Sequence, residues 1–209
     1  SFVLDYKDKV VLVTGVSSGI GLGVAREFAR AGAHVAGCSR KSPDDASVQA
    51  FREVVEQEGV RSFYRPADVT DAEELKGFVE EAARTFGRID MVVSNAGMNV
   101  FEGAEGCTEE RWHYNLDLNL ASHWRLARLC KPYLEKSGEG VLLLAGDAPD
   151  VADVLSGGAH VIVVESVPQA VLDHLVDNLL VAHTGAPALV GQGVRSSAHV
   201  LGAAADHDV

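Results

Sequence analysis

Short apolar runs alternate with amphipathic segments from Lys9 to Ala145. The amphipathic segments repeat their apolar residues at helical spacing, and the runs between them are typical of strands that are buried on both faces. The predicted strands are Val10 to Val13, His34 to Cys38, Arg61 to Pro66, Ile89 to Ser94 and Val141 to Ala145. The alternation predicts βαβ units and an α/β fold with a doubly wound parallel sheet in three layers, α/β/α.

Polar residues and glycines mark the ends of the predicted helices. Ser42-Pro43 places a capping hydroxyl before a proline, and Thr70-Asp71-Ala72-Glu73 has the pattern of a capping box. Gly32, Gly59 and Gly87 stand where C-caps belong. We therefore expect helices to begin at the first two segments and to end at the three glycines.

A long helical pattern follows from about Thr108 to Leu134. Its mostly apolar face carries Trp112, Leu116, Leu120, Trp124, Ala127 and Leu134. Aromatic residues at this spacing indicate core packing or a subunit interface rather than a cofactor site. A homo-oligomer is therefore a possible assembly.

The composition changes after about residue 146. Between Ser137 and Val209 the chain has no Lys, Phe, Tyr, Trp, Cys or Met, and it has five of its eight histidines. The periodicity still permits strands at Ala159 to Val164 and Ala188 to Val190, and a helix at Pro168 to Ala182. We expect one domain over residues 1–209, typical of the fold up to residue 145 and atypical or incomplete in residues 146–209.

Composition and charge narrow the class of protein. A chain of 209 residues with 47% hydrophobic residues can bury one substantial core. The formal net charge of -12 argues against nucleic acid or an anionic membrane as a partner. Cys38, Cys107 and Cys130 form no CxxC pair, which argues against disulfides or a metal site and favours a cytoplasmic location. We find no export signal or membrane-spanning stretch and expect neither export nor membrane insertion.

The segment from Thr14 to Gly21 is a glycine-rich turn between a predicted strand and a predicted helix. Gly15 allows a sharp turn, Gly19 lets backbone approach a pyrophosphate, and Gly21 lets the helix pack closely on the sheet. The N–H groups and dipole of the helix N-terminus favour a bound phosphate. The pattern predicts a Rossmann-like dinucleotide site built from Gly15, Ser17, Ser18, Gly19, Ile20 and Gly21.

Three further motifs follow in order: Asp68-Val69 after the third strand, Asn95-Ala96-Gly97 after the fourth, and Asn119 in the long helix. With the glycine turn they make the chain resemble the short-chain dehydrogenase/reductase family over roughly residues 5 to 145. The resemblance implies that Asp68 binds the adenine amino group with Val69 beside it, and that Asn95, Ala96 and Gly97 steady the sheet and line the nucleotide site. It also implies that Asn119 holds the helix kink and the water of the family's proton relay.

Ser39-Arg40-Lys41, after the second strand, bear on the choice of cofactor. A site that prefers NAD(H) places a carboxylate here to accept hydrogen bonds from the ribose 2′-OH. The uncharged Ser39 removes repulsion, and the guanidinium of Arg40 can pair with a 2′-phosphate. We therefore expect NADP(H) in preference to NAD(H), which stays possible. The alternative is that Arg40 and Lys41 form a solvated basic turn.

The catalytic part of the family pattern is missing. The resemblance implies a Ser after the fifth strand, then a Tyr, and a Lys four residues beyond it. No Tyr follows Tyr133 and no Lys follows Lys136. The pattern instead places Asp147 at the Ser position, His160 near the Tyr position and Val164 at the Lys position. Imidazole titrates near neutral pH, so His160 is a candidate acid; its alternative is a strand-edge residue.

Three interpretations stay open. The first is an NADP(H)-dependent oxidoreductase that transfers hydride to or from a carbonyl or secondary alcohol of a small molecule, with Asn119 and His160 as candidate catalytic residues. The second is a non-catalytic NADP(H)-binding protein. The third is a frame-shifted or fused variant of such an enzyme, which would explain the change of composition. With no Tyr or Lys in place, we expect NADP(H) binding with little or no carbonyl reduction.

Overall fold

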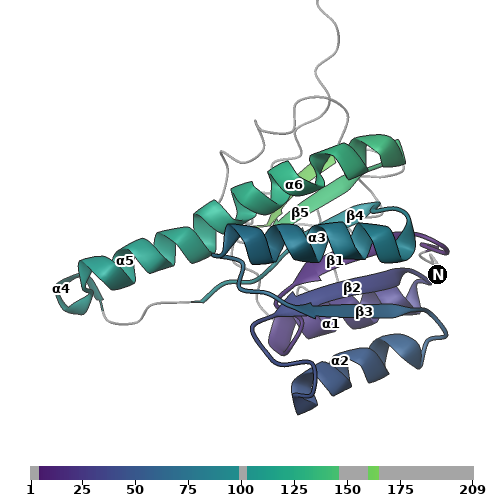
Figure 1. Ribbon diagram of the computed structural model, residues 1–209, viewed down its shortest axis with the longest axis horizontal. Helices are drawn as coiled ribbons and strands as arrows, with labels where there is room; N and C mark the ends of the chain where they lie inside the picture. The colour runs from purple at the N-terminus through teal and green to yellow at the C-terminus, as the bar shows by residue number, and fades with distance from the viewer. Residues whose placement is uncertain (1–4, 99–102, 146–159, 165–209) are drawn as a thin grey trace, which may run out of the picture.

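The computed structural model describes residues 5–98, 103–145 and 160–164 (Figure 1). Within these residues the strands form one parallel sheet: β1 (Val10–Thr14), β2 (His34–Ser39), β3 (Ser62–Pro66), β4 (Met91–Ser94), β5 (Val141–Ala145) and β6 (His160–Val164). The strand order is β3-β2-β1-β4-β5-β6. The chain thus builds outward in one direction from β1 and then in the other, so the predicted doubly wound sheet is confirmed.

Helices connect the strands on both faces of the sheet. They are α1 (Gly19–Arg30), α2 (Ala46–Glu56), α3 (Ala72–Phe86), α4 (Gly103–Gly106), α5 (Glu109–Leu116), the π-helical turn η1 (Asp117–Ala121) and α6 (Ser122–Ser137). α1 packs against α2, and α3 packs against α6. α5, η1 and α6 form one long rod, as the sequence pattern predicts, and its α5 end extends beyond the sheet (Figure 1).

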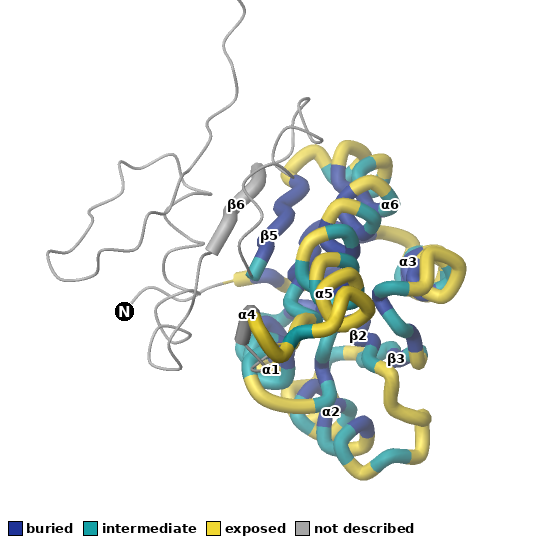
Figure 2. Tube along the Cα trace, turned by 90° about the vertical axis from the view of Figure 1, so that its left-hand side faces the viewer, coloured by how far each residue is buried: buried dark blue, intermediate teal, exposed yellow. Residues whose placement is uncertain are grey.

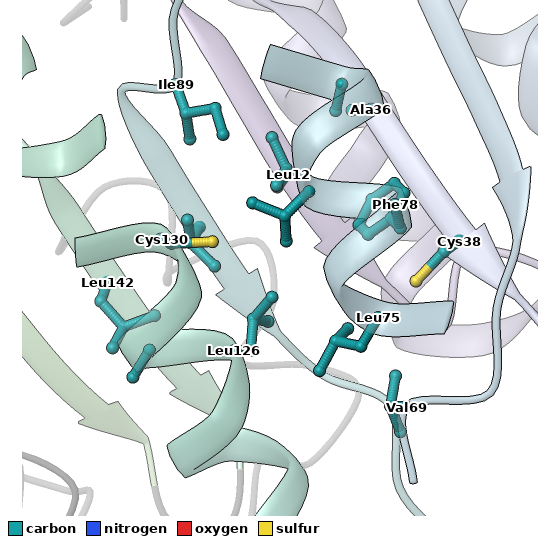
Figure 3. Packing of buried hydrophobic residues seen from close by; sticks show 14 of the residues in the cluster. Leu12, Ala36, Cys38, Val69, Leu75, Phe78, Ile89, Leu126, Cys130 and Leu142 are labelled. Carbon is teal, nitrogen blue, oxygen red and sulfur yellow. The ribbon is translucent and has the colours of Figure 1, made fainter. Parts of the chain in front are cut away.

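The core lies in two layers, one on each face of the sheet. Val10 and Leu12 of β1 pack with α3 and α6, whereas Val11 and Val13 pack with α1 and α2. Successive side chains of a strand point to opposite faces, so a sheet covered on both sides requires an uninterrupted apolar run. Figure 3 shows Leu12 among residues of the α3–α6 layer, and Figure 2 shows buried strands between helices whose outer sides are exposed.

Two helices begin later than the sequence pattern predicts. The N-caps are Asp45 for α2 and Asp71 for α3, and their carboxylates accept backbone N–H groups of the first turn. The predicted caps at Ser42-Pro43 and Thr70 were therefore wrong, because an aspartate caps as well as a hydroxyl and adds a negative charge at the positive helix end. Gly87 is the C-cap of α3, with a left-handed φ of 81°, as predicted.

Some of the predicted elements and residues fall in parts of the chain that the structure does not describe. The predicted helix at Pro168 to Ala182 and strand at Ala188 to Val190 lie outside the described residues, as does Asp147. Among the residues that the structure describes, no helix is long and apolar enough to cross a membrane, and no three His, Cys, Asp or Glu side chains gather in a way that could hold a metal ion.

Candidate functional site

The predicted cofactor residues come together where the parallel strands end. The glycine turn follows β1, Ser39 ends β2, Asp68 follows β3, and Asn95 follows β4. The carboxyl ends of parallel strands meet at one edge of a sheet, and the strand order reverses between β1 and β4. Ligands of doubly wound proteins bind at such a switch point. This edge is the candidate site.

The glycine turn has two crowded positions and one open position. A Cβ atom on Gly21 would lie 2.2 Å from the carbonyl oxygen of Gly15 and 2.7 Å from Nδ2 of Asn95. Gly15 has a left-handed φ of 78°, and a Cβ there would lie 3.0 Å from the same Nδ2 atom. A Cβ on Gly19 would meet nothing within 4 Å. The turn therefore requires Gly15 and Gly21 for its own packing, while Gly19 offers an open backbone surface suited to a pyrophosphate.

The N-terminus of α1 is uncapped. Ser18 is the N-cap residue, but its side chain makes no capping hydrogen bond, and the first turn of α1 holds no acidic residue. By contrast, aspartate carboxylates cap α2 and α3. The first N–H groups of α1 and its positive dipole end are thus left to a negatively charged ligand, which Ser17 and Ser18 would flank. These features fit a dinucleotide.

Thr14 joins the glycine turn to the loop after β4, a role that our sequence analysis missed. Its Oγ1 accepts the N–H of Asn95 at 2.9 Å and the N–H of Ala96 at 3.0 Å. Nδ2 of Asn95 donates to the Thr14 carbonyl at 3.0 Å. Thr14 is buried, so these bonds are shielded from water. A hydroxyl residue at the end of an otherwise apolar strand was the available signal.

Tyr64 of β3 holds the basic loop after β2, and it was also missed. Ser39 Oγ lies 2.8 Å from Tyr64 Oη, which donates to the Lys41 carbonyl at 2.7 Å. Burial raises the pKa of Tyr64 above its ordinary value, so the phenol keeps its proton for these bonds over a wider pH range. The bonds give the loop a defined backbone position, while the side chain of Arg40 stays exposed.

Asp68 and Val69 face different surroundings. Oδ1 of Asp68 accepts hydrogen bonds from the N–H and the hydroxyl of Thr70, at 2.9 and 2.7 Å. This local turn fixes the carboxylate beside the carboxyl edge of the sheet. Val69 is buried in the α3–α6 layer of the core, where Figure 3 shows it near Leu75. The adenine contact of Asp68 stays a prediction.

Asn119 lies in the π-helical turn η1 and holds the loop after β4. Its Oδ1 accepts the N–H of Met98 at 3.0 Å, and its Nδ2 donates to the Met98 carbonyl at 2.9 Å and to Oδ1 of Asn115. A Cβ on Gly97 would lie 2.7 Å from Asn119 Oδ1. Asn119 thus joins the long helix to the Asn95–Gly97 segment. Its part in a proton relay stays a prediction.

His160 lies at the amino ends of the parallel strands, opposite the carboxyl ends where the cofactor residues gather. It opens β6 and pairs with Val141, the first residue of β5. A five-residue strand spans roughly 13 to 17 Å, and this length separates the amino edge from the cofactor residues. His160 therefore lies one strand length from the cofactor residues, because it is the first residue of β6 and the strand runs from it toward the carboxyl edge. Val164 ends β6 opposite Ala145, at the carboxyl edge.

Known proteins match the same part of the chain. The short chain dehydrogenase family profile matches residues 9–145. Hydroxynaphthalene reductase arp2 of Aspergillus fumigatus is 36% identical over 143 residues, which are 67% of this chain and 50% of the relative. L-fucose dehydrogenase of Bos taurus is 36% identical over 138 residues, 66% of this chain and 48% of the relative. The chain spans about half the length of these relatives.

Solved structures show the same fold. A dehydrogenase/reductase from Sinorhizobium meliloti 1021 superposes with a TM-score of 0.63 at 27% identity, covering 69% of this chain and 56% of the other. Carveol dehydrogenase from Mycobacterium avium, solved in complex with NAD, gives a TM-score of 0.63 at 23% identity over 68% of this chain and 55% of the other, and shows the fold alone. Since the family profile covers well over half of the sequence, the chain belongs to the short-chain dehydrogenase family of NAD(P)-binding oxidoreductases.

Proposed function

We propose that the chain binds NADP(H), and that the reaction it serves exchanges hydride between this cofactor and a carbonyl or secondary alcohol of a small molecule. The observation that carries the proposal is the open backbone at Gly19 before the uncapped N-terminus of α1, with Arg40 on the neighbouring loop. The relatives named reductase and dehydrogenase support the hydride chemistry. When bound, the nicotinamide would supply the hydride.

The residues of the chain bind and orient the cofactor in this account. The α1 N–H groups and dipole stabilise the pyrophosphate. Ser39, whose hydroxyl contacts Tyr64, brings no negative charge beside the adenosine ribose. The guanidinium of Arg40 is always charged and pairs with a 2′-phosphate. Thr14 and Asn119 hold the loop after β4 on both of its sides.

Replacing Arg40 by Ala should weaken NADPH binding selectively. Loss of a charge-assisted hydrogen bond to the 2′-phosphate should raise the dissociation constant of NADPH about 10- to 100-fold, whereas that of NADH, which lacks the 2′-phosphate, should change by less than about threefold. Fluorescence titration of both cofactors measures the effect. Arg30→Ala is the matched control, because Arg30 is also exposed but ends α1. Equal losses for both cofactors would contradict the assignment.

The second interpretation, a binding protein without hydride chemistry, rests on the missing Tyr and Lys. No Tyr follows Tyr133 and no Lys follows Lys136. This interpretation predicts NADPH binding with little or no reduction of a panel of ketones. Turnover at ordinary enzyme rates would refute that expectation and favour a complete oxidoreductase. A family-like Tyr and Lys in another frame of the coding DNA would support the frame-shifted variant.

An apolar ridge marks the outer side of the long helical rod. Trp112, Leu116, Leu120 and Trp124 stand four residues apart and are 39% to 53% exposed. Ala127 and Leu134 of the same predicted face are buried in the core. We propose that the ridge contacts a second copy of the chain, because a regular ridge can pack against its own twofold mate.

Leu120→Glu should therefore convert an oligomer to a monomer. A carboxylate at the centre of the ridge must lose its hydration when two copies meet, which is costly without a paired cation. Sedimentation velocity at tens of micromolar protein measures the assembly. Arg84→Glu on the outer side of α3 is the control and should leave the oligomeric state unchanged. A monomeric wild-type chain would overturn the proposal.

A further inference from the structure

Arg40 is tied to the long helical rod. Its Nη1 donates a hydrogen bond to Oη of Tyr114 at 3.2 Å. Arg40 follows β2, whereas Tyr114 lies in α5, which comes after β4 in the chain. The bond therefore reaches from one side of the topological switch point to the other. It places the guanidinium over the carboxyl edge of the sheet, where the cofactor residues gather.

Tyr114 is a firm anchor for this bond. Its ring is half-buried and packs against the α3–α6 layer of the core. Leu118, one helical turn later, is buried in the same layer. This packing restricts where the phenol oxygen can lie, whereas an arginine side chain at the surface ordinarily samples many rotamers.

The geometry of the guanidinium leaves room for a second partner. A guanidinium has five N–H groups, and Tyr114 takes one of those on Nη1. The edge formed by Nε and Nη2 can still bind two oxygen atoms of a phosphate in parallel. Ser39 and Lys41 hold the backbone on either side of Arg40 through Tyr64. The loop backbone beside Arg40 and the Nη1 end of its side chain therefore each have a hydrogen-bonded partner.

We propose that Tyr114 is a specificity-determining residue, which positions Arg40 for the 2′-phosphate of NADP(H). It is a positioning residue, because it acts through Arg40. Fixing the guanidinium before binding lowers the entropy lost when the phosphate arrives. NADH gains nothing from this, since it has no 2′-phosphate for Arg40 to bind. The inference rests on the proposed role of Arg40 in NADP(H) binding.

Tyr114→Phe tests the proposal, because it removes the hydroxyl and keeps the ring. We expect the dissociation constant of NADPH to rise about three- to tenfold, and that of NADH to change by less than about twofold. In an Arg40→Ala background, Tyr114→Phe should have no further effect on NADPH. The matched control is Tyr133→Phe, whose ring also packs against the α3–α6 layer but from α6. It should leave both affinities and the melting temperature unchanged.

Each of the following results would overturn the proposal. Equal weakening of NADPH and NADH would indicate a structural role for Tyr114, and tighter NADPH binding would show that Tyr114 competes with the phosphate for Arg40. An effect that persists in the Arg40→Ala background would show that Tyr114 acts through another group. If Arg40→Ala itself leaves NADPH affinity unchanged, the proposed 2′-phosphate site fails. If Arg40→Ala weakens NADPH and Tyr114→Phe does not, only the role of Tyr114 fails.

Discussion

Gly21→Ala should abolish measurable dinucleotide binding and destabilise the fold by about 2 to 3 kcal/mol. The added Cβ would lie 2.2 Å from the carbonyl oxygen and 2.8 Å from the carbonyl carbon of Gly15. Both atoms belong to the backbone of the glycine turn, so they cannot rotate away as a flexible side chain does. The turn and the N-terminus of α1 must separate, and the N–H groups leave the position that holds the pyrophosphate.

Gly23→Ala is the matched control for this variant. Gly23 lies in α1 two residues later, and a Cβ there would meet nothing within 4 Å. Because alanine favours the helix, this variant should gain about 0.5 to 1 kcal/mol of stability and keep its affinity for NADPH. Urea unfolding and fluorescence titration measure both quantities. Similar stability and NADPH affinity in the two variants would show that the close packing at Gly21 is not required for dinucleotide binding.

Asp90→Ala should destabilise the protein by about 2 to 4 kcal/mol without changing the affinity of the folded protein for NADPH. The Asp90 carboxylate is 2% exposed and accepts hydrogen bonds from the Val10 N–H, the Arg88 guanidinium and the Ser137 hydroxyl. It joins the start of β1, the segment before β4 and the end of α6. Without it, the buried N–H of Val10 loses its partner. Urea unfolding measures the loss.

Arg88→Ala is the control for Asp90, because its side chain is 45% exposed and water can replace part of its interaction. Arg88→Ala should lower the free energy of unfolding by less than half as much as Asp90→Ala does. An equal loss of unfolding free energy in the two variants would show that the Arg88–Asp90 ion pair, rather than the hydrogen-bond network around the buried carboxylate, stabilises the fold.

The same carboxylate gives a testable pH dependence. Burial alone would raise the pKa of Asp90, but hydrogen bonds from Arg88, Ser137 and Val10 outweigh it and hold the pKa below its usual value. The unfolded chain then binds this proton first, at about pH 3.9. The contribution of Asp90 to stability is therefore complete above this pH and is lost as the pH falls toward the lowered native pKa. The stability difference between wild type and Asp90→Asn should shrink over this acidic range.

Local signals in the sequence predict much of the fold and the glycine turn. The apolar run Val10 to Val13 and the three glycines that follow determine conformation within a few residues, so the strand, the turn and the start of α1 could all be predicted. The predicted cap at Ser42 was wrong because a second acceptor, the Asp45 carboxylate, lies three residues later and caps α2 instead.

Contacts between distant segments could not be predicted in this way. Nothing near Tyr64 indicates that its hydroxyl reaches Ser39, and nothing near Tyr114 indicates that it meets Arg40. Both depend on how β3 and α5 are placed around β2. His160 shows the same limit, because alignment to a family pattern placed it near a catalytic position, while strand pairing puts it at the opposite edge of the sheet.

Parallel titration of the wild-type chain with NADPH and NADH decides whether the chain binds a dinucleotide and which one it prefers. Arg40 follows the uncharged Ser39, and the uncapped N-terminus of α1 provides the proposed pyrophosphate site. We expect both dinucleotides to bind, and NADPH to bind at least about tenfold more tightly than NADH. Tighter binding of NADH, or no binding of either cofactor, would contradict this expectation.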